Sequence, residues 1–353
     1  MNETIKLTPR QRSILSALSE HDRMSRDDIS SWIKNSYPVS KATLARDLED
    51  LLIAENIKAE GNGRSRVYLL KTKHPLLKPV DLNLYFELEA DERKNINKCF
   101  QIMVLESITG LFSDEEKNKL TKEYRSFGEV KKNMDRTILE KELERFVIEL
   151  AWKSSKIEGN TYTLLETETL IKQNLEAKGR SKQETEMILN HKLAFKLILD
   201  NLVDFKKPKL NVLLELHNVL TKNLEITSGI RKSAVGITGT NYRPIDNEWQ
   251  IREALEKLIL AINRSEYPLE KALIANSVVA YLQPFVDGNK RTARMFSNAI
   301  LMANDYFPLS YRSVDENEYK EAMLLFYETN NLYHVKRLFV EQYRFALKTY
   351  FVE

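Results

Sequence analysis

An aspartate and two arginines lie close together in the last third of the chain, where one apolar helix ends and another begins. Gly288 lets the backbone turn ahead of the second helix, and the free N–H groups at such a helix start attract anions, especially phosphate. Arg291 and Arg294 are spaced three residues apart, so both project from one face of that helix. Asp287 adds a carboxylate where Mg²⁺ could bridge phosphate groups. The segment therefore predicts binding of a Mg²⁺-nucleotide.

Helices are expected to position these residues, because segments with apolar residues at three- and four-residue spacing fill most of the chain. The expected fold class is mainly α. Strand-like sequence is limited to 64–70 and 233–245. The predicted helical segments are 140–205, 209–225, 250–264, 269–282, 289–304 and 316–350.

The first 75 residues form a distinct pattern. Thr8, Ser25 and Ser40 are each expected to cap a short helix, and residues 53–70 predict a hairpin with a Gly-Asn-Gly tip. Three short helices and a basic hairpin predict a winged helix-turn-helix, and Val39–Leu51 resembles the recognition helix of DeoR-type bacterial repressors. The residues expected to contact DNA are Ser40, Lys41, Thr43, Arg64 and Arg66. The alternative is a winged helix used only for protein contacts.

Charge and composition agree with this division. Residues 1–75 hold 13 Lys/Arg and 10 Asp/Glu, whereas the rest of the chain holds 41 of each. The excess positive charge thus lies in the predicted DNA-binding domain. A linker with two prolines follows, so we expect domains at 1–75 and 137–350, joined by a helical connector at 76–136. The charged stretch 113–136 within it is expected to be a solvated helix.

The sequence also excludes several classes of protein. The single cysteine excludes an intramolecular disulfide framework. The sequence predicts no transmembrane segment, signal peptide or membrane partner, and a cytoplasmic location is expected.

Residues 283–294 read Gln-Pro-Phe-Val-Asp-Gly-Asn-Lys-Arg-Thr-Ala-Arg. This segment resembles the signature of Fic-domain proteins, His-Pro-Phe-x-Asp/Glu-Gly-Asn-Gly-Arg-x-x-Arg. Most members transfer AMP from ATP to a hydroxyl group of a target protein. The resemblance implies an all-helical Fic domain in which Asp287 holds Mg²⁺ and Arg294 holds the γ-phosphate. The residues expected to bind the nucleotide are Gly288, Asn289, Lys290, Arg291 and Arg294.

Two further segments resemble parts of the same family. Residues 154–160, Ser-Ser-Lys-Ile-Glu-Gly-Asn, look like its inhibitory motif, which implies an inhibitory helix near 150–160. There Ser154 and Glu158 are the motif residues, and Glu158 would pair with Arg294 and compete with the γ-phosphate. Residues 229–245 resemble the family's β-hairpin flap, which clamps a target segment by strand addition. The expected target-contacting residues are Val235, Gly236, Ile237 and Thr238.

Two positions depart from the signature. Gln283 stands where the family has its histidine base, and an amide cannot accept the proton of a hydroxyl group. Lys290 stands where AMP-transferring members usually have glycine. A lysine at this position resembles the Doc branch of the family, whose members phosphorylate their targets. His217 is a weak candidate for a substitute base, since a histidine on a helix is more often part of the core.

The sequence leaves several functions open. It favours a transcriptional regulator, expected to be a homodimer, whose Fic site binds ATP and Mg²⁺ without a general base. The alternative is an autoinhibited protein adenylyltransferase with reduced or altered activity, which includes an enzyme whose histidine was replaced to trap a complex. A Doc-like phosphotransferase and a scaffold without nucleotide are further alternatives. The expected partners are ATP, DNA and a target protein at the flap.

Overall fold

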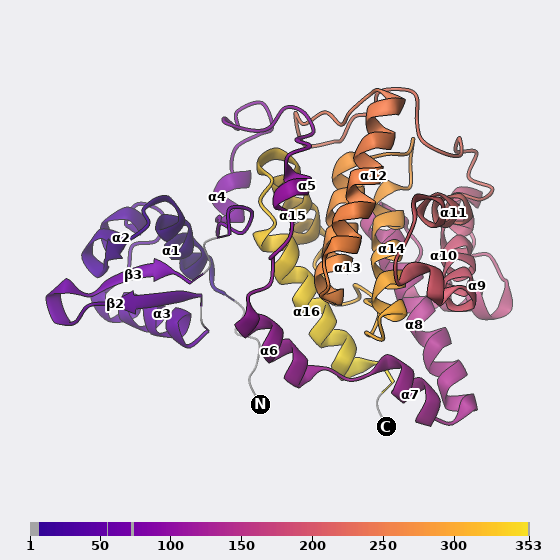
Figure 1. The fold of residues 1–353 in the computed structure, drawn as a ribbon, viewed down its shortest axis with the longest axis horizontal. Helices are drawn as coiled ribbons and strands as arrows, with labels where there is room; N and C mark the ends of the chain where they lie inside the picture. The colour runs from indigo at the N-terminus through magenta and orange to yellow at the C-terminus, as the bar shows by residue number, and fades with distance from the viewer. Residues whose placement is uncertain (1–6, 55, 72–73, 352–353) are drawn as a thin grey trace.

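The computed structural model describes residues 7–54, 56–71 and 74–351. A small N-terminal unit stands beside a larger helical body (Figure 1). The elements of the N-terminal unit are α1 (Pro9–Glu20), β1 (Met24–Ser25), α2 (Arg26–Ile33), α3 (Lys41–Ile53), β2 (Ile57–Glu60), a 3₁₀ turn (Gly63–Ser65) and β3 (Val67–Leu70).

The three helices of the N-terminal unit begin where capping residues predicted. The side chains of Thr8, Ser25 and Ser40 each accept a hydrogen bond from the backbone N–H three residues later. The strands form an antiparallel sheet in the order β1–β3–β2. The helices and the sheet enclose a small apolar core of their own, to which α3 contributes Leu44 and Leu48.

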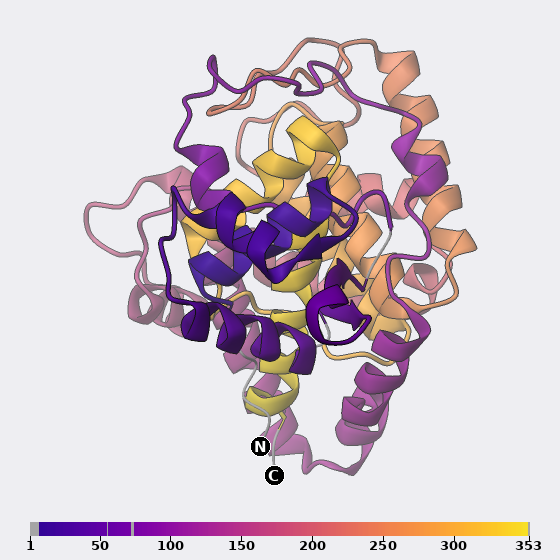
Figure 2. The ribbon, with the colours of Figure 1, turned by 90° about the vertical axis from the view of Figure 1, so that its left-hand side faces the viewer.

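The N-terminal unit lies against α15 (Glu316–Thr329) and α16 (Tyr333–Thr349) of the body (Figure 2). Tyr333 packs against the core of the N-terminal unit. Arg12 Nη1 lies 3.7 Å from Glu318 Oε1. The two units are therefore in direct contact through α1, α15 and α16.

Residues 76–136, where we expected a helical connector, contain four short helices. They form α4 (Leu82–Phe86), α5 (Val104–Ser107), α6 (Asp114–Glu123) and α7 (Phe127–Asn133), with irregular chain between them. Leu120 and Phe127 are buried in the core of the body, and α6 and α7 follow its lower edge in Figure 1. A few well-spaced apolar residues thus hold this highly charged segment on the core, while the other residues of 113–136 are exposed or half-buried.

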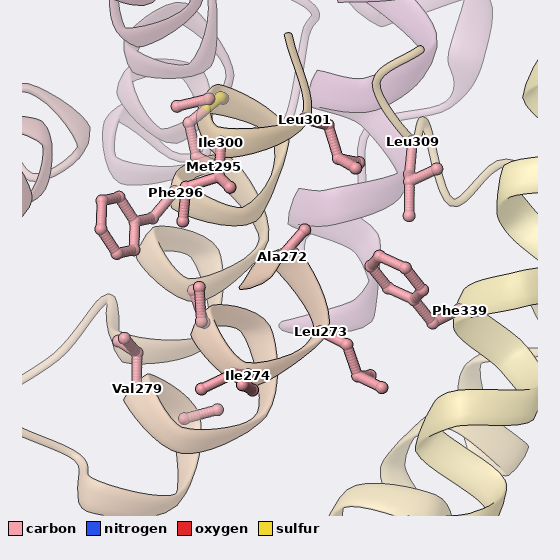
Figure 3. Close-up of a cluster of buried hydrophobic side chains, with 14 of the residues drawn as sticks. Ala272, Leu273, Ile274, Val279, Met295, Phe296, Ile300, Leu301, Leu309 and Phe339 are labelled. Atoms are coloured by element: carbon pink, nitrogen blue, oxygen red, sulfur yellow. The ribbon is translucent and has the colours of Figure 1, made fainter. Parts of the chain in front are cut away.

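The body consists of helices packed around two buried central helices, α13 (Pro268–Leu282) and α14 (Asn289–Ala303). Every residue of α13 from Leu269 to Leu282 is buried, which explains why most of its sequence is apolar. Figure 3 shows apolar side chains of α13 and α14 together with Phe339 of α16. The other elements of the body are α8 (Arg136–Ile157), α9 (Leu164–Gln173), α10 (Lys182–Asp200), a 3₁₀ turn (Leu202–Phe205), α11 (Leu210–Leu220) and α12 (Glu248–Arg264).

The segment expected to form a β-hairpin flap contains no strand. Residues 233–238 lie outside helices and strands, and the one bridge in this region pairs Cys99 with Arg243. The buried side chain of Arg231 holds the segment instead: its guanidinium donates to the carbonyl oxygens of Gln283 (2.7 Å), Ser233 (2.6 Å) and Ile245. The hairpin prediction was wrong because an arginine, rather than a strand ladder, supplies these backbone partners.

None of the helices in the described part of the chain is long and apolar enough to cross a membrane.

Candidate functional site

A tight turn joins α13 to α14 and forms the frame of the site. Gln283 caps α13 with a left-handed backbone (φ 49°), and Gly288 precedes α14 with φ 80°. A Cβ atom at Gly288 would lie 3.0 Å from the Thr221 side chain, so glycine suits both the backbone and the space. Asn289 closes the turn, because its side chain accepts from the Phe285 N–H (2.8 Å) and donates to the Phe285 carbonyl (2.9 Å).

This turn changes the expected part of Asn289 in phosphate binding. Both polar atoms of its side chain are used inside the turn, which leaves its backbone N–H for an anion. The first turn of α14 has no side-chain cap in the described structure, so its N–H groups are suited to an anionic ligand.

The two arginines of the motif are buried, at 2% exposure for Arg291 and 0% for Arg294. Arg291 Nη2 donates to Asp287 Oδ2 over 3.2 Å. Within the described residues, Nη1 of each arginine is buried without a hydrogen-bond partner. An unpaired buried donor costs about 1–3 kcal/mol, and such groups often mark a missing ligand or water. Two orphaned guanidinium donors next to an uncapped helix start fit phosphate oxygens.

Glu158 occupies part of this site. It caps the C-terminus of α8, and its Oε1 lies 2.9 Å from Arg294 Nη2, while its Oε2 lies 3.3 Å from Lys290 Nζ. Burial by itself would raise the pKa of Glu158, but the charges of Arg294 and Lys290 hold that pKa below its ordinary value. The carboxylate is therefore ionised and paired at neutral pH.

The cavity that remains beside Glu158 is small, at about 60 Å³. Pockets that enclose whole ligands usually measure roughly 300–1,000 Å³. This volume admits a few waters or part of a phosphate group but no nucleotide. The lining residues are Glu158, Gln283, Asp287, Gly288, Asn289, Lys290 and Arg291.

A chain of buried hydrogen bonds fixes the guanidinium of Arg294. Arg294 Nε donates to Ser154 Oγ (3.0 Å), and Ser154 Oγ lies 2.9 Å from His191 Nε2. His191 Nδ1 lies 2.7 Å from the Met187 carbonyl, which can only accept. Nδ1 therefore carries the proton, and Nε2 accepts from the Ser154 hydroxyl. Sequence reasoning missed His191, since α10 follows the inhibitory motif with no spacing that links the two.

Gln283 lies at the cavity in the place expected for the base. Its side-chain Nε2 donates to the Ala280 carbonyl over 2.6 Å, and its backbone carbonyl accepts from Arg231. The amide thus contributes a carbonyl oxygen that can bind a hydroxyl group but cannot remove its proton.

His217 does not supply the missing base. It is fully buried and stacks on Phe285 with ring centroids 3.6 Å apart. Its Nε2 lies 3.0 Å from the Asp287 carbonyl and donates to it. Burial lowers its pKa to about 4. These contacts are those of a core histidine that supports the turn.

A magnesium ion would find few protein ligands at this cavity. No group of three or more His, Cys, Asp or Glu side chains gathers around a metal position within residues 7–54, 56–71 and 74–351. Mg²⁺ on a nucleotide needs only one or two carboxylates, since phosphates and water complete its shell. The side chain of Asp287 is 66% exposed at the cavity mouth, so it fits Mg²⁺ that arrives with a nucleotide.

The residues expected to contact DNA lie on the N-terminal unit, away from this cavity. Ser40 and Lys41 are exposed at the start of α3, where Ser40 Oγ lies 2.9 Å from Thr43 Oγ1. Arg66 is exposed on the hairpin. The side chain of Arg64 lies outside the described part of the chain.

Residues 207–301 match the model of the Fic/DOC family. The chain therefore carries a Fic/DOC family domain, as the resemblance of residues 283–294 predicted. The protein adenylyltransferase Fic of Nematostella vectensis is 29% identical over 177 residues, which are 49% of this chain and 41% of that protein. The protein adenylyltransferase Fic of Drosophila grimshawi is 29% identical over 49% of this chain and 37% of its own length. This chain spans about two-fifths of these curated relatives.

Solved structures show the same fold at low sequence identity. Fic-1 from C. elegans superposes with a TM-score of 0.59 and 16% identity, over 97% of this chain and 98% of that chain. A Fic domain containing signaling protein from Bacteroides thetaiotaomicron gives a TM-score of 0.54 and 19% identity, over 65% of this chain and 93% of that chain.

Proposed function

We propose that the Fic/DOC domain of this chain is an autoinhibited protein adenylyltransferase, which transfers AMP from ATP to a hydroxyl group of a protein. The observation that carries the proposal is the ion pair between Glu158 and Arg294, which occupies the cavity beside two orphaned arginine donors. An inhibitory contact has a purpose only where an activity needs inhibition. The similarity to proteins named protein adenylyltransferase also supports the enzyme over the regulator that the sequence favoured.

The residues of the site have distinct parts in the proposed reaction. Arg291, Arg294 and the first N–H groups of α14 bind the phosphates, so that charge on the leaving pyrophosphate is stabilised in place. Asp287 would hold Mg²⁺, which would neutralise phosphate charge when bound. The target hydroxyl oxygen forms a bond to the α-phosphorus, and the bond from that phosphorus to the bridging oxygen breaks.

The proton of the target hydroxyl has no base to receive it at Gln283. The side-chain carbonyl oxygen of Gln283 can accept a hydrogen bond and orient the hydroxyl group. The proton then passes to water. The loss of general-base help costs on the order of 10²–10⁴ in rate. We therefore expect slow transfer by this chain even after Glu158 is removed.

Intact-mass analysis after incubation with ATP and Mg²⁺ tests this proposal. We compare E158G, which removes the inhibitory carboxylate, with E158G/Q283H, which also restores a base, and with R294A in the double variant as the inactive control. Gain of AMP mass by E158G/Q283H, faster than by E158G, supports an adenylyltransferase site. Gain of phosphate mass would support a Doc-like phosphotransferase instead. No gain of mass, either by the chain itself or by a generic protein added as substrate, would count against transfer.

A second function, DNA binding by the N-terminal unit, is proposed on a separate observation. Lys41 and Arg66 are exposed at the start of α3 and on the hairpin, the two elements that a winged helix uses on DNA. The excess positive charge of the chain lies in the same 75 residues. A homodimer would read two half-sites, and the enzyme would then act at or near its own DNA site.

A further inference from the structure

Glu158 is held by two cations rather than one. Arg294 takes Oε1 at 2.9 Å and Lys290 takes Oε2 at 3.3 Å, so each carboxylate oxygen has its own partner. Lys290 lies in the first turn of α14, and its side chain is 31% exposed, whereas that of Arg294 is 1% exposed. At this position the Fic signature has glycine, which cannot make the contact.

The surroundings of Glu158 disfavour an ionised carboxylate with only one cationic partner. The residue caps the C-terminus of α8, where the partial negative charge of the helix end disfavours a carboxylate. The side chain is also largely withdrawn from water, at 17% exposure. Burial of an ionised carboxylate is costly unless it is fully paired, and Arg294 alone reaches only one of the two oxygens.

Lys290 also faces the cavity where phosphates are expected to bind. The remaining cavity is lined by both Lys290 and Arg291, and Arg291 is already paired with Asp287. Departure of Glu158 would leave Lys290 and Arg294 without a carboxylate partner. A polyphosphate is the anion that can replace one carboxylate on two cations at once.

We propose that Lys290 is a second inhibitory residue, which holds Glu158 together with Arg294 and transfers to a phosphate of ATP when Glu158 leaves. This inference rests on the proposed function, because it assigns the regulation of the same site. It makes the nucleotide affinity of this chain depend on Lys290 in opposite ways in the two states. In the closed state Lys290 opposes ATP, and in the open state it binds ATP.

A double-mutant cycle on ATP affinity tests the transfer. Isothermal titration with ATP and Mg²⁺ is performed on the full chain, K290M, E158G and E158G/K290M. In the E158G background, K290M should weaken ATP binding roughly tenfold, the size of one charged hydrogen bond. In the parent background the two roles oppose each other, so the change should be less than roughly threefold in either direction. An equal fold-change in both backgrounds would overturn the proposal.

Lys156 provides a matched control. It lies two residues before Glu158, but its Nζ pairs with Glu316 at 3.4 Å, outside the cavity. K156M should therefore change ATP affinity by less than twofold in both backgrounds.

A second cycle, on unfolding by urea, keeps the two proposals separable. E158Q, K290M and E158Q/K290M are compared without nucleotide, and the closed state predicts non-additive losses of stability for the single variants. Additive losses would overturn the inhibitory contact of Lys290. If E158G does not bind ATP at all, the proposed function and the transfer both fail, whereas non-additive unfolding would still identify the Lys290–Glu158 pair.

Discussion

The imidazole of His191 accepts a hydrogen bond from the hydroxyl of Ser154, with Nε2 and Oγ 2.9 Å apart in a fully buried contact. Because the same hydroxyl oxygen accepts from Arg294 Nε, a neutral histidine on α10 orients the arginine that we assign to the γ-phosphate. This relationship joins three segments that are distant in sequence, and it gives the first predictions.

The hydroxyl of Ser154 should contribute more to the free energy of unfolding than that of Ser155. S154A removes the partner of both His191 and Arg294, and we expect a loss of about 1–3 kcal/mol in the free energy of unfolding. S155A is the matched control, since Ser155 Oγ is buried without a hydrogen-bond partner in the described structure. Urea denaturation of the two variants checks this. Equal losses would mean that the Ser154 hydrogen bonds contribute nothing beyond packing.

Acid should destabilise the protein through its buried histidines. Burial lowers the pKa of His191 to about 3, that of His217 to about 4 and that of His334 to about 3, from an ordinary value of 6.5. Between these values and pH 6.5 the unfolded chain binds more protons than the folded chain, so the free energy of unfolding falls as the pH drops through this window.

The variant H191Q isolates the contribution of one histidine. It should reduce the slope of unfolding free energy against pH by up to about 1.4 kcal/mol per pH unit between pH 6 and pH 4. H21Q replaces an exposed histidine and is the control for the substitution itself. Unfolding free energies at several pH values provide the measurement, and a slope that H191Q does not alter would contradict a neutral buried His191.

The flap segment should depend on Arg231. R231A removes the donor to the carbonyls of Gln283, Ser233 and Ile245, and we expect faster amide hydrogen exchange across 233–245 and earlier cleavage there by protease. K232A is the control, because the Lys232 side chain next to Arg231 is 80% exposed. Unchanged exchange in R231A would show that other contacts hold the segment.

DNA binding should depend on salt through the hairpin arginines. R64A/R66A should weaken binding and reduce the slope of log K against log salt by about 0.9 for each phosphate that is no longer neutralised. R136A removes an arginine that is 90% exposed on α8 of the body and should leave the slope unchanged. Titration of a fluorescent duplex at several salt concentrations measures both slopes, and a parental slope in R64A/R66A would place the hairpin away from DNA.

Local signals in the sequence predicted the local structure well. Ser40 caps α3 where expected, because a hydroxyl followed by a helical pattern acts within one turn. The partnership of Glu158 with Arg294 also followed from motifs, since the resemblance to Fic proteins linked two distant segments. The same resemblance predicted a flap hairpin that the structure does not contain.

The missed features are tertiary contacts with no local signature. Arg231 reaches across to Gln283, and Glu328 is fully buried because Arg93 and Tyr85 both donate to it from the connector. Sequence periodicity cannot show which buried charge meets which partner, so nothing in the sequence marks these contacts. For the same reason the sequence did not show that Leu120 and Phe127 of the connector reach the core.

Competition between Glu158 and ATP for Arg294 underlies the proposed autoinhibition. Isothermal titration of the parent and of E158G with ATP and Mg²⁺ measures this competition directly. We expect E158G to bind ATP at least roughly tenfold more tightly, because a charged hydrogen bond of about 1.5–3 kcal/mol no longer has to be broken. Equal affinity of the two chains would contradict the competition.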